Sequence, residues 1–181
     1  PAVNIHRSPL CGRNFEYDSE DPLLAGKIAA AMVRGIQSRH IAATVKHFAC
    51  NNKETNRKNS DSRLSQRALR EIYLRPFEIV IREAEPWAVM SSYNIINGRR
   101  ASESRELLTD ILREDWGYTG MVMTDWWTKG EHYKEILAGN DLKMANGYPE
   151  RVQQAMDLGL VSREDLETCA RRVLELILKI D

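Results

Sequence analysis

The chain contains 181 residues, which is enough for one domain with a sizeable hydrophobic core. Hydrophobic residues make up 43% and charged residues 29%, a globular composition that excludes a disordered chain. Lysine plus arginine and aspartate plus glutamate both total 26, and this zero net charge argues against nucleic acid as a partner. No apolar run approaches the roughly 18 residues of a membrane span, so we expect no membrane partner.

Cysteine usage bears on the cellular compartment. Cys11, Cys50 and Cys169 form no CxxC pair and no zinc-binding spacing, and their odd number argues against a disulfide framework. The first residues show no charged segment followed by a small-residue cleavage site, so no signal peptide is visible in this sequence. A reducing compartment is the simplest expectation, and we therefore expect a cytoplasmic location.

Apolar periodicity and turn signals predict alternating strands and helices. Residues 2–6 are expected to form a short strand. Asp21 and Pro22 then open a helix, as N-cap and first helical position. The apolar face of that helix is expected to carry Ala25, Ile28, Ala29, Met32 and Ile36.

In the middle of the chain, the sequence predicts a strand over residues 41–48, a polar loop over residues 51–61 and a long helix over residues 62–84. Pro76 should kink that helix or break it. The elements predicted after it are a strand at 87–93, a turn at Asn97–Gly98, a helix capped by Ser104, a strand at 120–124 that ends at Asp125, a helix near 130–138, a short strand at 141–144, and helices near 149–158 and 162–179, the last with Ser162 and Asp165 as a capping box.

Short apolar strands that alternate with helices are typical of βα units on a parallel sheet, with strands buried on both faces. Five such units are too few for a closed eight-stranded barrel, which takes about 250 residues. Two architectures therefore stay open: an open five-stranded sheet, or the last five-eighths of a (β/α)8 barrel. We treat residues 1–181 as a single α/β domain.

Chemically active side chains follow the predicted strands, at the edge of a parallel sheet that normally carries the site. Asp125 can be a nucleophile, a base or a metal ligand, and Trp126 offers a flat surface for a sugar ring. Arg13 and Arg57 add donors that suit hydroxyls or a carboxylate. Together with Lys46, they should keep Asp125 ionised, as a nucleophilic carboxylate requires.

Each of these residues also has a purely structural explanation. Asp125 can cap the next helix, Lys46 can be a solvated strand end, and His47 can be a hydrogen-bonded core histidine. Trp126 and Trp127 can simply pack. Adjacent strand residues normally point to opposite faces, so Lys46 and His47 reach one ligand only where the strand twists or ends.

The order of several motifs along the chain is more specific than any one of them. The segments are Asn4–Tyr17 with Ser19–Pro22, Lys46–Ala49 with Asn51, Asn52, Glu54, Asn56 and Arg57, Arg67–Leu74, Met90–Asn94 with Asn97 and Gly98, Trp116–Tyr118, and Thr124–Trp126. In this order they resemble glycoside hydrolase family 3, the β-glucosidases. The resemblance covers nearly the whole chain.

The resemblance implies a fold and an activity. The fold is a (β/α)8 barrel or a variant of it, of which residues 1–181 are the C-terminal portion. The activity is hydrolysis of a β-linked oligosaccharide or glycoside with retention, through a covalent glycosyl-enzyme, releasing terminal non-reducing β-D-glucosyl residues. The resemblance implies no cofactor and no metal.

The resemblance also implies roles for individual residues. Asp125 stands where the family's nucleophile stands, and the residues matched to the sugar pocket are Arg13, Lys46, His47, Arg57, Met90, Tyr93 and Trp126. Of these, Arg13, Lys46 and His47 match residues that hold hydroxyls of the terminal sugar. Arg57 lies in the loop that supports the Lys46–His47 pair.

Two departures from the family pattern concern parts of the site. The first barrel strands, with a sugar-binding carboxylate that they supply in many members, are expected outside this chain. The acid/base residue usually comes from an α/β sandwich domain, which is also expected outside it. One subgroup, the N-acetylglucosaminidases, has Pro-Gly-His where this chain has Ala49, Cys50 and Asn51, so that subgroup is disfavoured.

Unpaired sheet edges and uncovered apolar surface should favour association. We expect self-association, or pairing with the rest of the parent enzyme. Three alternatives to a β-glucosidase-type domain stay open: a catalytically inactive half-barrel, a β-xylosidase-type specificity, and an unrelated open α/β domain, which the motif order disfavours.

Overall fold

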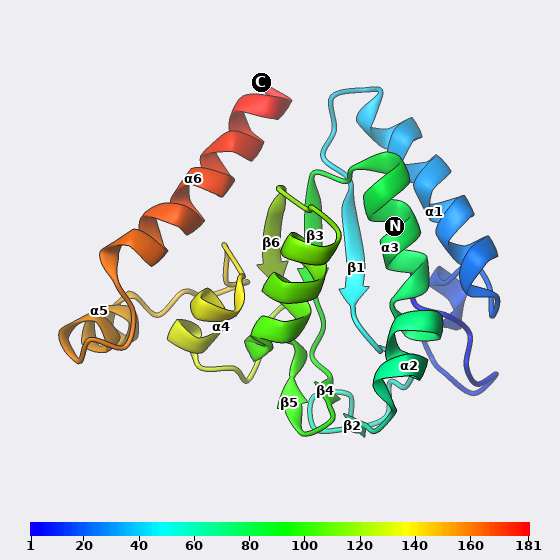
Figure 1. Ribbon diagram of the computed structural model, residues 1–181, viewed down its shortest axis with the longest axis horizontal. Coiled ribbons are helices and arrows are strands. Elements are labelled where there is room, and N and C mark those ends of the chain that lie inside the picture. Colours follow the sequence, from blue (N-terminus) through cyan, green and yellow to red (C-terminus); the bar gives the residue numbers. More distant parts are fainter.

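Three parallel strands form the centre of the computed structural model, which describes residues 1–181 (Figure 1). They are β1 (Thr44–Phe48), β3 (Ala88–Ser91) and β6 (Met121–Thr124), in the order β1-β3-β6. The predicted α/β class with a parallel sheet is therefore confirmed. Each central strand is shorter than the segment that the sequence predicts.

The two outer strands predicted from the sequence are wrong in extent. Residues 2–6 contribute one parallel bridge, between Ala2 and Lys46. Residues 141–144 likewise contribute one, between Leu142 and Met123. A strand needs consecutive pairs along its neighbour, and each outer segment provides a single one. Both still run parallel beside the sheet, so five segments follow one another in chain order.

A second, smaller sheet lies beyond the carboxyl ends of the central strands (Figure 1). It contains β2 (Asp61–Ser62), β4 (Ile95–Ile96) and β5 (Arg99–Arg100). The turn predicted at Asn97–Gly98 is confirmed and joins β4 to β5. Both turn residues have positive φ, +49° and +86°, as a tight two-residue hairpin loop requires.

Helices connect the strands. The α-helices are α1 (Pro22–Gln37), α2 (Gln66–Ala68), α3 (Arg75–Ala84), α4 (His132–Ala138), α5 (Pro149–Asp157) and α6 (Arg163–Ile180). Shorter 3₁₀ segments are η1 (Asn14–Glu16) and η3 (Ala101–Glu103), and wider π-type turns form η2 (Leu69–Tyr73) and η4 (Glu106–Asp115). In Figure 1, α3 and η4 lie in front of the central strands.

Local sequence signals set several helix ends. Oδ1 of Asp21 accepts the backbone N–H of Leu23 at 2.7 Å, so the predicted N-cap of α1 is confirmed. The capping box of Ser162 and Asp165 opens α6 as predicted. The long helix predicted over residues 62–84 is divided, since α3 begins at Arg75 with Pro76 in its first turn, and Pro76 has no N–H to continue the preceding ladder.

The predicted apolar face of α1 is confirmed at Ala25, Ala29 and the partly buried Ile36, and it is wrong at Ile28 and Met32. The buried residues are Ala25, Gly26, Ala29, Ala30 and Val33, whereas Ile28 and Met32 are 36% and 44% exposed. The reason is close packing against α3, which small side chains permit. At Gly26 an added Cβ would lie only 2.9 Å from Cβ of Ile79.

The central sheet is covered on one face. Val45, Val89 and Val122 lie in register and belong to the core beneath the helices. Met90 and Met123 pair across β3 and β6 and are only half-buried. On that same face the paired Ala88 and Met121 are buried, so the expectation that the strands are buried on both faces holds at the start of β3 and β6 and is wrong at Met90 and Met123.

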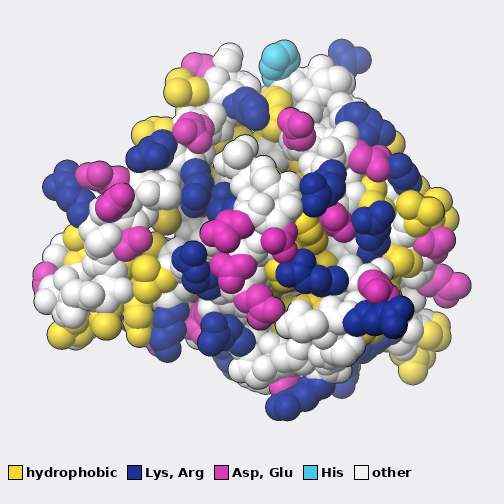
Figure 2. All heavy atoms as spheres, in the orientation of Figure 1, with side chains coloured by type: hydrophobic (Ala, Val, Ile, Leu, Met, Phe, Trp, Pro, Cys, Tyr) yellow, Lys and Arg dark blue, Asp and Glu magenta, His cyan; other side chains and the backbone are white.

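The outer surface mixes charges of both signs. Figure 2 shows Lys and Arg interspersed with Asp and Glu over the face that α3 and η4 cover. Hydrophobic side chains gather over α5 at the left margin of that view. Leu158 and Leu160, which follow α5 in the sequence, are exposed. None of the helices is both long and apolar enough to cross a bilayer.

The contact between α1 and α3 generates a stability prediction. We expect Gly26→Ala to lower the free energy of unfolding by about 1–2 kcal/mol, because overpacking against Ile79 outweighs the gain in helix propensity. Gly35→Ala is the matched control in the same helix, because nothing lies within 4 Å of its new Cβ. It should raise stability by up to about 1 kcal/mol. Urea unfolding of both variants measures the difference, and equal midpoints would contradict this packing.

Candidate active site

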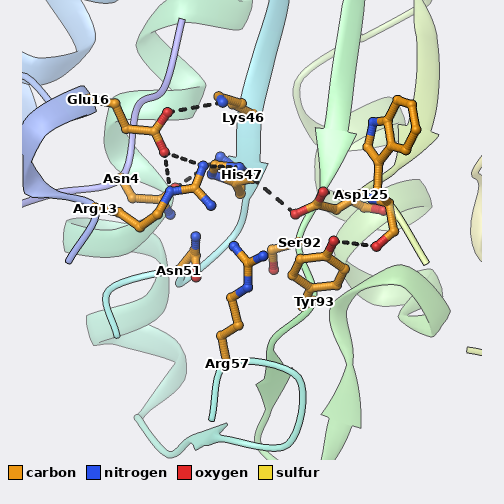
Figure 3. Close-up of polar contacts among 12 residues, drawn as sticks. Asn4, Arg13, Glu16, Lys46, His47, Asn51, Arg57, Ser92, Tyr93 and Asp125 are labelled. Atoms are coloured by element: carbon orange, nitrogen blue, oxygen red, sulfur yellow. Dashed lines mark hydrogen bonds and ion pairs between the residues drawn. The ribbon is translucent and has the colours of Figure 1, made fainter. Parts of the chain in front are cut away.

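The candidate site lies at the carboxyl edge of the central sheet (Figure 3). Asp125 directly follows β6, Tyr93 lies just after β3, and Lys46 and His47 belong to the last half of β1. The carboxyl ends of neighbouring parallel strands meet at one edge. The fold therefore brings together side chains that are distant in sequence.

An irregularity in β1 shapes the position of its two polar residues. The register of β1 against β3 shifts between Val45 and Phe48, and the Lys46–His47 peptide bond is cis. The register shift interrupts the strict alternation of side chains at Lys46 and His47. With such an irregularity, two neighbouring strand residues can both contribute to one site.

Asp125 is buried, with 7% of its surface exposed, so its carboxylate needs partners. Its Oδ1 accepts the backbone N–H of Trp126 at 2.7 Å. Its Oδ2 lies 3.9 Å from Nε2 of His47. Its own backbone N–H donates to the carbonyl of Ser91 at 3.0 Å, which ties the residue to the end of β3.

Burial governs the protonation of Asp125. It raises the pKa of this carboxyl, and the Trp126 N–H, the Tyr93 hydroxyl, Arg57 and Arg13 act against that rise. The sequence predicted that nearby cations would keep Asp125 ionised. Arg57 and Arg13 do lower the pKa, whereas desolvation is the larger effect and raises it overall; ionisation at neutral pH stays a prediction. Lys46 does not take part, because its Nζ pairs with Glu16 at 3.0 Å.

His47 is neutral. Burial and the charges of Arg13, Lys46 and Arg57 lower its pKa to about 2. Its Nε2 lies 3.1 Å from Nη2 of Arg13, and a guanidinium can only donate, so Nε2 is the acceptor. The ring proton is then on Nδ1, which faces the Tyr17 hydroxyl at 3.4 Å.

Arg13 is held by two carboxylates, Glu16 and Glu54, which were not among the predicted site residues. Its guanidinium contacts Glu16 and lies 3.6 Å from Oε1 of Glu54. Glu54 also accepts from Arg57 at 3.3 Å. The only sequence signal for these partners was their presence in the family-like motifs, because ion pairs across distant loops leave no local pattern. Figure 3 places Glu16 on the far side of Arg13 from Asp125.

Tyr93 links two loops over the site. Its hydroxyl donates to the carbonyl of Trp126. The guanidinium of Arg57 and Nζ of Lys58 each lie 4.7 Å from its ring centroid, so two cations flank one aromatic ring. Burial and the charge of Asp125 raise the pKa of Tyr93 to about 12, so the hydroxyl remains a donor at neutral pH.

Two tryptophans present open aromatic surface beside Asp125. Trp126 is 43% exposed and Trp127 is 57% exposed, so neither is a core residue, and the packing explanation fails for both. Their rings meet edge to face with centroids 5.4 Å apart. Nζ of Lys58 donates to the carbonyl of Trp127 at 3.1 Å, which fixes the position of this loop.

The structure does not bring every predicted residue to Asp125. Arg13, His47, Arg57, Tyr93 and Trp126 surround it, whereas Met90 is half-buried on the uncovered face of the sheet, and Lys46 contacts Glu16. No group of three or more His, Cys, Asp or Glu side chains is placed to hold a metal ion.

This geometry defines an α/β domain whose site centres on one buried carboxylate flanked by cations and exposed aromatic rings. The family model of the glycosyl hydrolase family 3 N-terminal domain matches residues 1–176. The chain belongs to this family, which confirms the resemblance drawn from the motifs.

Known relatives and structures are similar to the chain over most of its length. Beta-glucosidase A of Butyrivibrio fibrisolvens is 66% identical over 167 residues, covering 92% of this chain and 20% of the relative. Exo-alpha-(1->6)-L-arabinopyranosidase of Bifidobacterium longum is 44% identical over 180 residues, which cover 99% of this chain and 24% of the relative. Beta-glucosidase 3B from Thermotoga neapolitana, solved in complex with alpha-D-glucose, superposes with a TM-score of 0.95 at 46% identity, covering 99% and 26%. The chain thus spans about a fifth to a quarter of these proteins.

The low pKa of His47 predicts a pH dependence of stability. The unfolded chain binds a proton at this residue near the ordinary histidine pKa of 6.5, and the folded chain binds it only near 2. Stability is therefore lost as pH falls below about 6.5, by up to about 1.4 kcal/mol per pH unit. His47→Gln should flatten the pH dependence of urea unfolding between about pH 6 and pH 4. The exposed His40, replaced in His40→Gln, is the control and should leave the slope unchanged; equal slopes in all three proteins would contradict the prediction.

Proposed function

We propose that this chain supplies the nucleophile subsite of a retaining β-glucosidase, with Asp125 as the nucleophile. The observation that carries the proposal is the buried Asp125 carboxylate, bonded to the Trp126 N–H beside exposed tryptophan rings. Retaining chemistry requires such a carboxylate beneath the anomeric carbon. The names of the relatives support the substrate class.

The proposed reaction has two steps. Oδ of Asp125 attacks the anomeric carbon while the bond to the leaving-group oxygen breaks, and an acid protonates that oxygen. Water then attacks the glycosyl-enzyme, the conjugate base of that acid accepts the proton of the water, and the sugar and the Asp125 carboxylate are released. The negative charge of Asp125 stabilises the oxocarbenium-like transition state electrostatically. The acid/base carboxyl group belongs, in this proposal, to the rest of the parent enzyme.

The donors around Asp125 suit a ring of hydroxyl groups. Arg13 presents a planar guanidinium, and neutral His47 accepts a hydrogen bond from its Nη2 without adding charge. Lys46 lies on the same strand as His47. Its Nζ pairs with Glu16 and still has protons to donate to a hydroxyl group. These groups can fix the sugar while the exposed ring of Trp126 packs on its apolar face.

We also infer that the central sheet is an arc of a (β/α)8 barrel, the C-terminal portion of the family's catalytic barrel. Five parallel segments follow one another in chain order without reversal, and α1 packs beside α3. A doubly wound sheet would reverse its order and place helices on both faces. The uncovered sheet face and the exposed apolar side chains of α6, such as Leu178, fit pairing with the rest of the parent enzyme or with another copy.

Labelling of Asp125 tests the proposed role directly. We expect incubation of the chain with a 2-fluoro β-glucoside carrying a dinitrophenolate leaving group to give a stoichiometric adduct in the intact mass. This leaving group departs without acid assistance, so the acid/base is not needed. Peptide mapping should place the adduct on Asp125, and Asp125→Asn should abolish it. A folded chain that forms no adduct would mean that no competent subsite exists within these residues, which is the inactive half-barrel alternative.

The sugar is tested with the same chemistry. The similarity to an arabinopyranosidase keeps a pentopyranose specificity, such as the β-xylosidase type, as the second candidate. Labelling by a 2-fluoro β-xyloside faster than by the glucoside would favour that candidate.

The role of Lys46 in sugar binding yields a further prediction. We expect Lys46→Ala to slow labelling at subsaturating reagent by about 10- to 100-fold, because a hydrogen bond from a charged donor contributes about 1.5–3 kcal/mol. Lys53→Ala is the matched control, since Lys53 is an exposed lysine of the following loop. Equal labelling rates in the two variants would remove Lys46 from the site.

A further inference from the structure

A buried ion pair lies outside the residues assigned to the candidate site. Glu135 of α4 is 0% exposed, and Lys143, in the segment after α4, is 8% exposed. Nζ of Lys143 contacts Oε2 of Glu135. The mechanism above uses neither residue, so the presence of two opposite charges in the protein interior requires another explanation.

The pair is fully hydrogen-bonded, and the loop after Asp125 supplies part of that bonding. Besides Glu135, Nζ of Lys143 donates to Oγ1 of Thr128 at 3.0 Å and to the carbonyl of Gly130 at 3.1 Å, which uses all three of its protons. Oε1 of Glu135 accepts from Oγ1 of Thr128 at 2.7 Å and from Oγ of Ser102 at 2.9 Å. The ion pair is therefore bonded to two residues of the 126–130 loop.

The loop also packs closely on the pair. A Cβ added at Gly130 would lie 2.3 Å from Oε1 of Glu135. A glycine is thus required for the backbone to approach the carboxylate. The backbone next to Lys143 holds the other end of the loop, because the N–H of Trp127 donates to the carbonyl of Met144 at 3.0 Å.

The same loop carries the groups that face Asp125. The Trp126 peptide donates its N–H to Oδ1 of Asp125 at 2.7 Å and accepts the Tyr93 hydroxyl through its carbonyl. The rings of Trp126 and Trp127 are the exposed aromatic surface of the site. A shift of the loop would move all of these groups together.

A buried ion pair contributes little net stability compared with apolar residues of the same volume, because desolvation offsets the attraction. We propose that Glu135 and Lys143 are positioning residues. They hold loop 126–130 through Thr128 and Gly130, and so set the Trp126 peptide against Asp125 and the two tryptophan rings beside the sugar subsite. The catalytic consequence rests on the proposed function, whereas the positioning of the loop does not.

A single replacement of Glu135 or Lys143 leaves an unpaired buried charge and can unfold the chain. The test therefore uses Thr128→Val, which removes only the hydroxyl that joins the pair to the loop. Ser102→Ala is the matched control, because Ser102 donates to the same Oε1 of Glu135 but lies in η3.

The readout is the ¹⁹F NMR spectrum of the chain labelled with 5-fluorotryptophan, which reports on all four tryptophans. Single Trp→Phe variants assign the signals. We expect Thr128→Val to shift or broaden the signals of Trp126 and Trp127, while the distant Trp87 and Trp116 stay unchanged and confirm the fold. Ser102→Ala should leave all four signals unchanged. Unchanged loop signals in Thr128→Val, or equal changes in both variants, would overturn the proposal.

Labelling by the 2-fluoro glucoside separates this proposal from the proposed function. Thr128→Val should slow labelling by roughly tenfold or more, since a misplacement of about 1 Å can cost on the order of 100-fold, and Ser102→Ala should not. Loop signals that move with no change in the labelling rate would refute the catalytic consequence. An unmodified chain that is not labelled would refute the nucleophile subsite, whereas the NMR comparison would still decide whether the pair positions the loop.

Discussion

The burial of the Asp125 carboxylate is the constraint on which the rest of the site depends. Water reaches only a small part of this residue, so the protein must supply hydrogen bonds and charge in its place. The Trp126 N–H supplies a direct bond, and Arg13 and Arg57 supply opposing charge from two separate loops. These loops meet at Asp125 only because the central strands are parallel and end at one edge.

The charges around Asp125 are balanced. Arg13 is paired with Glu16 and Glu54, and burial among cations keeps His47 neutral. The sugar of the proposed function has many hydroxyl groups and no net charge, and paired charges offer donors and acceptors to such a molecule without a strong field. The cations near Asp125 lower its pKa, but desolvation of the buried carboxyl is the larger effect.

Local chemistry accounts for the parts of the fold that were predicted correctly. The Asp21 cap, the Ser162–Asp165 capping box, the break at Pro76 and the Asn97–Gly98 turn each depend on a few neighbouring residues. The central strands follow from short apolar runs. The errors concern long-range packing: the face of α1 is selected by its approach to α3 at Gly26, and the outer strands depend on pairing partners.

For the candidate site, the sequence by itself determined which chemical groups stand at the strand ends, and the ordered motifs determined the family. Only the tertiary structure decided what those groups do to one another. It set the direction of the pKa of Asp125, the tautomer of His47, and the partners Glu16 and Glu54 of Arg13. The physical reason is that desolvation and charge interactions depend on distances and burial across the whole fold, which no local pattern of residues contains.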